Sequence, residues 1–251
     1  MGKADLHIHT ARGDGMADLP ELLAHVQENT DLSVIAVTEH DDSRPGLEAR
    51  EMWARGSYRF EVVPGAEITT LEGHLLALYL KEPVESLRPL AETLEAVHRQ
   101  GGLCVIPHPM SWLTRSIGQR KIDRILREAR DGVYFDGMEV ADQSAGARVS
   151  IGKARRLNDE RYHFAAVGGS DAHFLAVVGS AYTLFEGQGA EDLRRAILAR
   201  TTEGVDGHSP SLMEIGLRQV LRQQVRGILV TPRKMGWRRT IASFFTRFLP
   251  K

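Results

Sequence analysis

Short apolar runs rich in β-branched residues alternate along this chain with longer amphipathic stretches, and this alternation restricts the fold more than any other sequence feature. It is typical of a mainly parallel β-sheet whose strands are joined by crossover helices. Strands are predicted at residues 4–8, 33–38, 60–64, 74–80, 103–107, 137–140, 164–167 and 181–185. Helices are predicted at residues 18–28, 46–55, 86–100, 121–130, 147–160, 190–199 and 210–226. The pattern therefore indicates an α/β domain.

Two of these helices have ends that the sequence marks. Asp18 suits the N-cap of the first helix and Pro20 suits its first turn. Gly101 and Gly102 follow the helix at 86–100, where glycine commonly ends a helix. No internal repeat or low-complexity linker occurs before about residue 203. We therefore expect a catalytic domain at residues 1–203 and a C-terminal basic helical extension at residues 204–251.

The overall charge and the cysteine content limit the partners and the compartment. The 251 residues carry a formal net charge of -1, so no global field would gather nucleic acid or anionic lipid from a distance. The single cysteine, Cys104, lies in an apolar run and is expected to be a buried small hydrophobe, which excludes a disulfide framework. We find no signal peptide and no apolar stretch of the roughly 20 residues that span a bilayer. A cytoplasmic location is therefore expected.

Histidine, aspartate and glutamate side chains gather near the ends of the predicted strands. His7 and His9 close the first strand, and the two-residue period of a strand points both imidazoles the same way. His74 begins its strand instead of ending it. The carboxyl ends of parallel strands share one edge of the sheet, where active sites of such folds lie. The candidate metal ligands are His7, His9, Asp14, His40, Glu67, His74, His108, Asp171 and His173.

Nine side chains of this kind exceed what a single cation uses, since a catalytic zinc typically takes three protein ligands and a water. The number therefore predicts a cluster of two or three divalent ions. Imidazole and carboxylate without thiolate suit Zn, Mn or Fe. Four further histidines, at positions 25, 98, 163 and 208, are expected to be ordinary hydrogen-bonded residues. Glu39 and Asp41 flank His40 and either orient ligating imidazoles or are solvated loop charges.

The motifs that carry these residues resemble those of the PHP (polymerase and histidinol phosphatase) family. They are Asp5-Leu6-His7-Ile8-His9-Thr10, Asp14-Gly15, Val37-Thr38-Glu39-His40-Asp41, Pro64-Gly65-Ala66-Glu67, His108-Pro109 and Gly169-Ser170-Asp171-Ala172-His173. The match runs from about residue 4 to residue 185. The resemblance implies a distorted seven-stranded, TIM-like (β/α) barrel with a trinuclear metal site.

The resemblance also implies how the ligands are shared among three metals. One ion would be held by His7, His9, Glu67 and Asp171, and a second by Glu67, His74 and His108. The third would be held by Asp14, His40 and His173. Asp14 stands where some branches of the family have histidine, a difference expected to alter metal preference more than mechanism.

The activity that the resemblance implies is metal-dependent hydrolysis of a phosphate ester, either a phosphomonoester or a nucleotide-type phosphodiester. A metal-bound hydroxide held by Glu67, Asp171 and His108 would attack the phosphorus. We expect Arg115 to bind the substrate phosphate, with Arg12 and Arg148 as further candidates, because arginine grips phosphate bidentately. The substrate would be a small phosphorylated molecule, with a nucleotide or an oligonucleotide end among the candidates.

Two other interpretations of the same residues stay open. Amidohydrolase-type metallohydrolases also begin with His-x-His after a first strand, but they usually need a bridging lysine, and no lysine stands at a predicted strand end. A non-catalytic PHP scaffold that binds metal or a partner is the second alternative. Such scaffolds tend to lose ligands, whereas all nine candidates are present here. A metal-dependent phosphoric ester hydrolase is the function predicted.

The C-terminal segment differs from the rest of the chain in its charge. Between residues 215 and 251 the chain has nine Lys or Arg residues and no Asp or Glu. Large apolar side chains recur there at helical spacing, which predicts a basic amphipathic helix. Such a helix either lies peripherally on an anionic membrane surface or packs on the barrel or a second subunit. Its apolar residues are Trp237, Ile241, Phe244, Phe245, Phe248 and Leu249.

Overall fold

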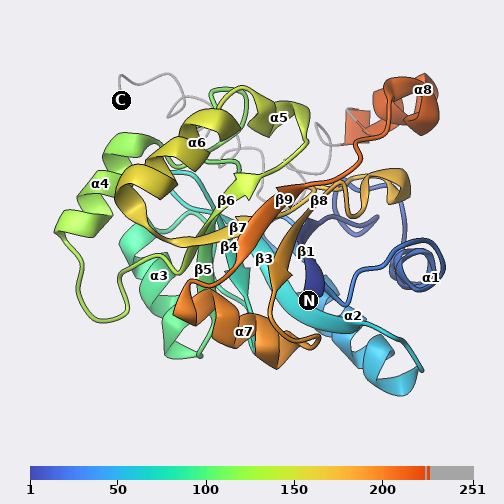
Figure 1. Ribbon diagram of the computed structural model, residues 1–251, viewed down its shortest axis with the longest axis horizontal. Coiled ribbons are helices and arrows are strands. Elements are labelled where there is room, and N and C mark those ends of the chain that lie inside the picture. Colours follow the sequence, from blue (N-terminus) through green and yellow to red (C-terminus); the bar gives the residue numbers. More distant parts are fainter. Residues whose placement is uncertain (224, 227–251) are drawn as a thin grey trace.

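The computed structural model describes residues 1–223, 225 and 226, and its centre is one mixed β-sheet curved into a nearly closed barrel (Figure 1). The nine strands lie in the order β7-β6-β5-β4-β3-β2-β1-β8-β9. They are β1 (Gly2–Ile8), β2 (Val34–Val37), β3 (Glu61–Thr69), β4 (His74–Leu78), β5 (Leu103–Ile106), β6 (Gly137–Ala141), β7 (Ala165–Gly168), β8 (Ala181–Phe185) and β9 (Glu203–Asp206).

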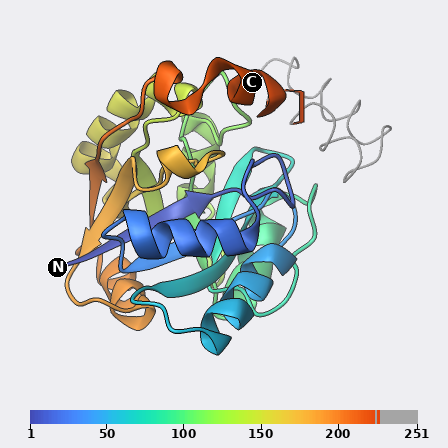
Figure 2. The ribbon, with the colours of Figure 1, turned by 90° about the vertical axis from the view of Figure 1, so that its right-hand side faces the viewer.

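Helices surround this sheet on its outer side (Figures 1 and 2). They are α1 (Leu19–Asn29), α2 (Arg44–Arg55), α3 (Leu90–Arg99), α4 (Gln119–Arg127), α5 (Ala145–Arg148), α6 (Ile151–Leu157), α7 (Ala190–Ala199) and α8 (Leu212–Ile215). A π-helical turn, η1 (Asn158–Tyr162), continues α6, and a 3-10 turn, η2 (Leu175–Val177), follows β7. The α/β class is therefore confirmed.

The strand number and the strand directions differ from the predictions. The sheet has nine strands, where the family resemblance implied seven and the apolar runs indicated eight. It is also not mainly parallel, because β1/β8, β3/β4, β4/β5 and β8/β9 are antiparallel pairs. The edge strands β7 and β9 approach each other closely, since a Cβ on Gly204 would lie 2.6 Å from the carbonyl oxygen of Val167. This approach nearly closes the barrel.

Strand β3 is longer than predicted because it changes partner partway along. Its first half pairs in parallel with β2, up to the pair of Val37 and Pro64. From Gly65 onward it pairs antiparallel with β4, ending at the pair of Thr69 and His74. The proline and glycine therefore mark the change of partner, and the prediction that the strand ends at residue 64 is wrong.

Helix ends confirm some predictions and correct others. Helix α1 begins as predicted, with the Asp18 carboxylate accepting from the Glu21 backbone N–H in a capping box. Helix α3 starts only at Leu90, because the residue before a proline avoids helical backbone and Pro89 stands just ahead. The single helix predicted at 147–160 is divided into α5, α6 and η1. The Ser150 hydroxyl at the first break donates to the Pro109 carbonyl oxygen.

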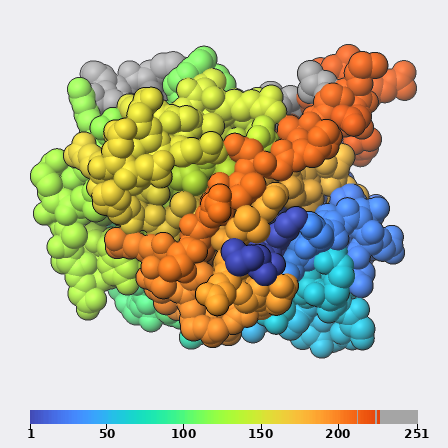
Figure 3. Space-filling model, viewed as in Figure 1, coloured from blue at the N-terminus to red at the C-terminus, as the bar shows by residue number. Residues whose placement is uncertain are grey.

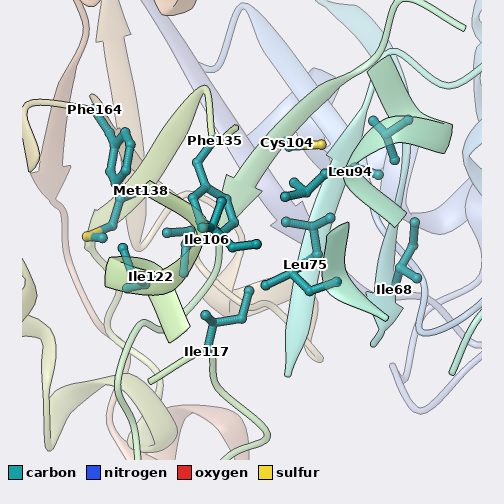
Figure 4. Packing of buried hydrophobic residues seen from close by; sticks show 14 of the residues in the cluster. Ile68, Leu75, Leu94, Cys104, Ile106, Ile117, Ile122, Phe135, Met138 and Phe164 are labelled. Atoms are coloured by element: carbon teal, nitrogen blue, oxygen red, sulfur yellow. The ribbon is translucent and has the colours of Figure 1, made fainter. Parts of the chain in front are cut away.

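Three apolar clusters fill the fold. The first packs β3 to β6 against α3 and α4, and Figure 4 shows it with Leu94 of α3 near Leu75 and Ile106 near Phe135. The second packs β1 to β5, β7 and β8 against α7, and the third packs β1 to β3 against α1 and α2. Cys104 is fully buried in the first cluster, as predicted. The helices are thus fixed on the sheet and leave the loops after the strands to form a rim.

The C-terminal extension is described only as far as residue 226. The helix predicted at 210–226 is broken at Gly216, whose φ of 89° lies outside the helical region, so α8 ends at Ile215 and helical backbone resumes at 217–223. The amphipathic helix predicted around Trp237 lies outside the described residues. Within residues 1–223, 225 and 226, no helix is long and apolar enough to cross a bilayer. The division of the chain at residue 203 stays a prediction, and residues 203–206 form β9.

Candidate metal centre

All nine candidate ligands converge on one rim of the barrel. They form four overlapping groups, and within each group one ligand atom from every member lies within 4.8 Å of the others. The groups are His9/Asp14/His40/His173, His7/His9/Asp171, His7/Glu67/His108 and His40/Glu67/His74. Shared members link the groups, so the rim carries one continuous cluster of six imidazoles and three carboxylates.

Glu67 is the centre of this cluster. Its carboxylate is buried, and Oε1 lies 2.6 Å from His74 Nδ1 and 2.8 Å from His108 Nε2. Oε2 lies 3.0 Å from His40 Nδ1, 3.4 Å from His7 Nε2 and 3.5 Å from His9 Nε2. The two oxygens therefore face different imidazoles, as a carboxylate that bridges two cations would.

The other two carboxylates of the cluster, Asp171 and Asp14, approach different ring nitrogens of His9. Asp171 Oδ1 lies 3.2 Å from His9 Nε2 and 3.5 Å from His7 Nε2. Asp14 Oδ2 lies 3.2 Å from His173 Nε2 and 3.9 Å from His40 Nε2. Asp14 Oδ1 also lies 4.0 Å from His9 Nδ1, and Asp171 Oδ1 lies 3.7 Å from His173 Nδ1, so the carboxylates share imidazoles and link the groups.

Several ligand-type atoms are buried without a hydrogen bond. His7 Nε2 and both ring nitrogens of His9 make no hydrogen bond to the described residues, although they are shielded from solvent. Leaving buried polar atoms unpaired costs free energy unless another partner is present. A divalent cation is such a partner for a neutral imidazole nitrogen. The donor set therefore fits divalent metal ions.

The backbone at two of the candidate ligands is strained. His108 has a φ of 28° and Asp171 has a φ of 50°, values that residues other than glycine rarely adopt. His108 lies two residues beyond the carboxyl end of β5, and Asp171 lies three residues beyond that of β7. Strain of this kind is stored where surrounding contacts enforce it, and such positions concentrate at functional sites.

At His9, Asp14 and Asp171, burial and the neighbouring charges favour the protonation states that bind metal. Burial, together with the nearby His173 imidazole, lowers the pKa of His9 to about 4. Burial alone would raise the pKa of Asp14, but the imidazoles of His173, His40 and His9 together outweigh it and hold that pKa well below its usual range. For Asp171 burial is likewise outweighed by the imidazoles, with His7 the largest contributor, so its pKa is also low. A neutral imidazole therefore stands between ionised carboxylates at neutral pH.

Glu139 supports two of these imidazoles and was missed by the sequence analysis. It lies in β6, fully buried, with Oε1 2.9 Å from His7 Nδ1. Its Oε2 accepts from the His108 backbone N–H at 2.5 Å. Because Nδ1 of His7 faces Glu139, Nε2 is the nitrogen that faces the cluster. A lone acid near the end of a predicted strand was the signal that could have identified it.

Three other acids fix the loops around the cluster. Asp5, also missed, accepts from the Ser170 backbone N–H at 3.0 Å and its hydroxyl at 2.6 Å, which ties β1 to the loop carrying Asp171. Glu39 is fully buried and accepts from the Thr10 backbone N–H. Asp41 accepts from the Thr69 backbone N–H at 2.7 Å. Neither Glu39 nor Asp41 is therefore a solvated loop charge.

The three arginines predicted to bind phosphate differ in their surroundings. Arg115 lies in the loop after β5, where its carbonyl oxygen accepts from the His74 backbone N–H at 2.6 Å. Arg12 donates to both oxygens of Glu48, at 2.9 and 3.0 Å. Arg148 donates to Ser209 Oγ at 2.9 Å. The Arg115 guanidinium also donates, to the Thr70 carbonyl oxygen at 3.4 Å, so all three arginines contact other residues, and Arg115 is the one whose backbone is bonded to a candidate ligand.

A second group, His98, Cys104 and Asp136, lies near the amino end of β5, away from the rim. His98 uses both ring nitrogens, one at 2.9 Å from the Gly132 carbonyl oxygen and the other at 2.9 Å from Asp136 Oδ2. Burial raises the pKa of the Cys104 thiol, which opposes the thiolate form that binds metal. This group is therefore a hydrogen-bonded structural contact, as expected for His98.

Fold and site together define an α/β-barrel protein with a metal-binding rim. A family model described as PHP-associated matches residues 152–202. An uncharacterised protein of Methanocaldococcus jannaschii, MJ1587, is 34% identical over 148 residues, which are 55% of this chain and 80% of that protein. The 5'-3' exoribonuclease Rnm of Salmonella typhimurium is 32% identical over 104 residues, covering 39% of this chain and 35% of that protein.

A solved structure shares the fold. It is a two-domain protein from Bacteroides vulgatus containing a predicted PHP-like metal-dependent phosphoesterase, with a TM-score of 0.61 and 17% identity. The likeness covers 89% of this chain and 69% of that one. The matches and the motifs show that this chain belongs to the PHP family.

Proposed function

We propose that this protein is a metal-dependent phosphoesterase that hydrolyses a phosphate ester at a centre of two or three divalent ions, Mn, Zn or Fe. The observation that carries the proposal is Glu67, one buried carboxylate whose two oxygens lie within 3.5 Å of five imidazoles. A catalytic zinc typically takes three protein ligands and a water, which is far fewer donors than surround Glu67. Divalent cations held by these residues would lower the pKa of a bound water to about 7 and would offset charge on a phosphate.

The proposed sharing of ligands follows the groups on the rim. His7, His9, Glu67 and Asp171 would hold one ion, and Glu67 would also serve a second with His74 and His108. Asp14, His40 and His173 would hold the third, and the position of His9 Nδ1, 4.0 Å from Asp14 Oδ1, adds that imidazole to the same neighbourhood. Glu67, Asp171 and His108 would surround the attacking water.

The chain's own side chains would organise this centre. Glu139 fixes which nitrogen of His7 faces the cations, and Ser116 Oγ, 2.9 Å from His108 Nδ1, does the same for His108. Burial of Glu67 and His7 keeps bulk water away from the carboxylate and imidazole donors, which strengthens their attraction to cations. Arg115, whose carbonyl oxygen accepts from the His74 backbone N–H, would grip a non-bridging phosphate oxygen.

We propose a nucleotide or an oligonucleotide end as the substrate class. The exoribonuclease relative supports this choice. A second support is Trp112, which is 70% exposed on the loop between His108 and Arg115. An exposed indole beside a phosphate site suits stacking on a nucleobase, an interaction worth about 1–3 kcal/mol per base.

The two alternative functions, an amidohydrolase and a non-catalytic scaffold, would call for different features in the site. An amidohydrolase would need a bridging lysine, and within the strands of the described chain lysine occurs only at Lys3, whose ammonium group pairs with Asp31. A non-catalytic scaffold would have no need of nine converging ligands or of strained backbone at His108 and Asp171. Both observations favour the phosphoesterase.

The test is hydrolysis of a panel of phosphomonoesters and phosphodiesters by the full-length protein supplied with Mn, Zn, Fe or Mg. The panel should pair nucleotides and 5'-phosphorylated oligonucleotides with sugar phosphates. The control is the double variant His7→Ala/Asp171→Ala. We expect metal-dependent turnover by the parent and none by the variant, and equal activity of the two would refute the proposed site.

A further inference from the structure

The segment that follows β9 returns to the metal-binding rim. Figure 3 shows β9 and this segment as one orange band that crosses a face of the molecule from α7 toward α8. In Figures 1 and 2 the same segment ends in the red helical turns of α8 and the residues after it. The last of these helical residues to be described is Arg226.

Arg226 contacts the loop that carries Asp14. Its Nε donates to the Gly13 carbonyl oxygen at 2.9 Å, and its Nη2 donates to the Ala11 carbonyl oxygen. These two carbonyls lie between His9 and Asp14, so the guanidinium spans the connection between two candidate ligands. The planar fork of arginine suits two such acceptors at once.

The same extension also lies against the segment that follows His173. A pocket between them is lined by Ile215 and Gln219 on one side and by Met16, Phe174 and Leu175 on the other. The two rim loops are joined directly, because the Met16 backbone N–H donates to the His173 carbonyl oxygen at 2.9 Å. The extension therefore faces the two loops that supply Asp14 and His173.

The other candidate ligands are held by different parts of the fold. His74 and Glu67 lie in paired strands, and His108 is fixed by Ser116 and Glu139. Within the described part of the chain, the Arg226 guanidinium donates only to the loop at residues 11–13. Loss of Arg226 would therefore affect the part of the cluster next to this loop, which lies between His9 and Asp14.

We infer that Arg226 is a positioning residue for the cation site formed by His9, Asp14, His40 and His173, so that the C-terminal extension sets the affinity of one metal ion. This inference rests on the proposed multinuclear centre. Residues that orient metal ligands without touching the metal typically contribute 10–100-fold to affinity. Arg226 acts in this way through the backbone of the loop, whereas Glu139 acts through an imidazole.

The experiment titrates Co²⁺ into the metal-free, full-length protein and follows the visible absorption of the bound ion together with the number of equivalents bound. The variants are Arg226→Gln, Arg226→Lys and the control Arg222→Gln, which removes an equal charge from an exposed position one turn earlier. We expect Arg226→Gln to weaken one equivalent by about 10-fold or more and to leave the others unchanged. Arg226→Lys should restore part of the loss, and Arg222→Gln should match the parent.

The opposing outcomes are distinct. Parent-like binding of every equivalent by Arg226→Gln would overturn the inference and leave the proposed function standing. An equal weakening of all equivalents, or the same loss in Arg222→Gln, would show a general effect of charge or stability and would also overturn it. A parent protein that binds no Co²⁺ would instead refute the proposed metal centre, and the inference with it.

Discussion

Replacing Glu139 by glutamine tests whether this carboxylate holds the candidate ligands His7 and His108 in place. Of the possible substitutions it changes the shape of the side chain least. The Glu139 carboxylate faces two groups, His7 Nδ1 at 2.9 Å and the His108 backbone N–H at 2.5 Å. A carboxylate accepts from both, but glutamine offers one acceptor oxygen and one NH₂ donor. In one orientation of the amide the buried His108 N–H loses its acceptor. In the other, His7 must accept at Nδ1 and therefore carry its proton on Nε2, the nitrogen that faces the cluster.

Both orientations weaken metal binding, and the size of the effect follows from the geometry. Loss of a residue that orients a ligating imidazole typically costs 10–100-fold in metal affinity, or about 1.4–2.7 kcal/mol. An unsatisfied buried N–H at His108 would also lower the free energy of unfolding by about 1–3 kcal/mol. We therefore expect Glu139→Gln to lose metal affinity and to show a lower Tm.

The assay is competition for Zn²⁺ between the protein and a chromophoric chelator, with Tm of the metal-free protein measured in parallel. Glu203→Gln is the matched control, because Glu203 is an exposed acid on another strand, β9. Glu139→Gln with the metal affinity and Tm of the parent would refute the argument that this carboxylate fixes His7 and His108.

Three further outcomes are expected. Trp112→Ala should raise KM for a 5'-phosphorylated oligonucleotide several-fold and leave KM for glycerol phosphate unchanged; an equal change for both substrates would exclude base stacking. Although burial opposes protonation, Asp14 raises the pKa of His173 to about 9, so the stability from this pair is present below pH 6.5 and is lost as pH rises toward 9. Tm of the chelator-treated protein should fall over that range, and a flat profile would contradict the pairing. Gly15→Ala places a Cβ 2.5 Å from the His9 carbonyl oxygen and should weaken the binding of one metal equivalent, whereas Gly118→Ala, with open space around it, should not.

The metal-binding rim was predictable because most of its ligand-type residues lie near the ends of apolar runs that predict strands. The sequence places His7 and His9 two residues apart after an apolar run, and the parallel strands β1 and β2 bring His40 to the same edge. The supporting residues were harder to identify. Glu139 belongs to no motif, and only the pairing of β5 with β6 puts it beside His108. Nothing local in the sequence relates Arg226 to the loop at residues 11–13, because the contact joins segments more than two hundred residues apart.

Errors in the strand predictions have a common physical cause. Apolar periodicity reports burial along a strand but carries no information about its neighbour. Strand β3 is continuous, yet it exchanges a parallel partner for an antiparallel one at Pro64 and Gly65, and these residues look like an ending. Strand β9 is short and half exposed, so it lacks the apolar run that marks a strand.

The direction of β4 explains why His74 belongs to the cluster although it begins a strand. His74 is the first residue of its strand, and in a parallel sheet that position would lie at the edge opposite His108. Because β4 runs antiparallel to both β3 and β5, its beginning lies beside the end of β3, with His74 paired to Thr69. The reversal brings His74 Nδ1 to 2.6 Å from Glu67 Oε1. A strand of opposite direction thus adds a donor to the central carboxylate that a uniformly parallel barrel would have to supply from a loop.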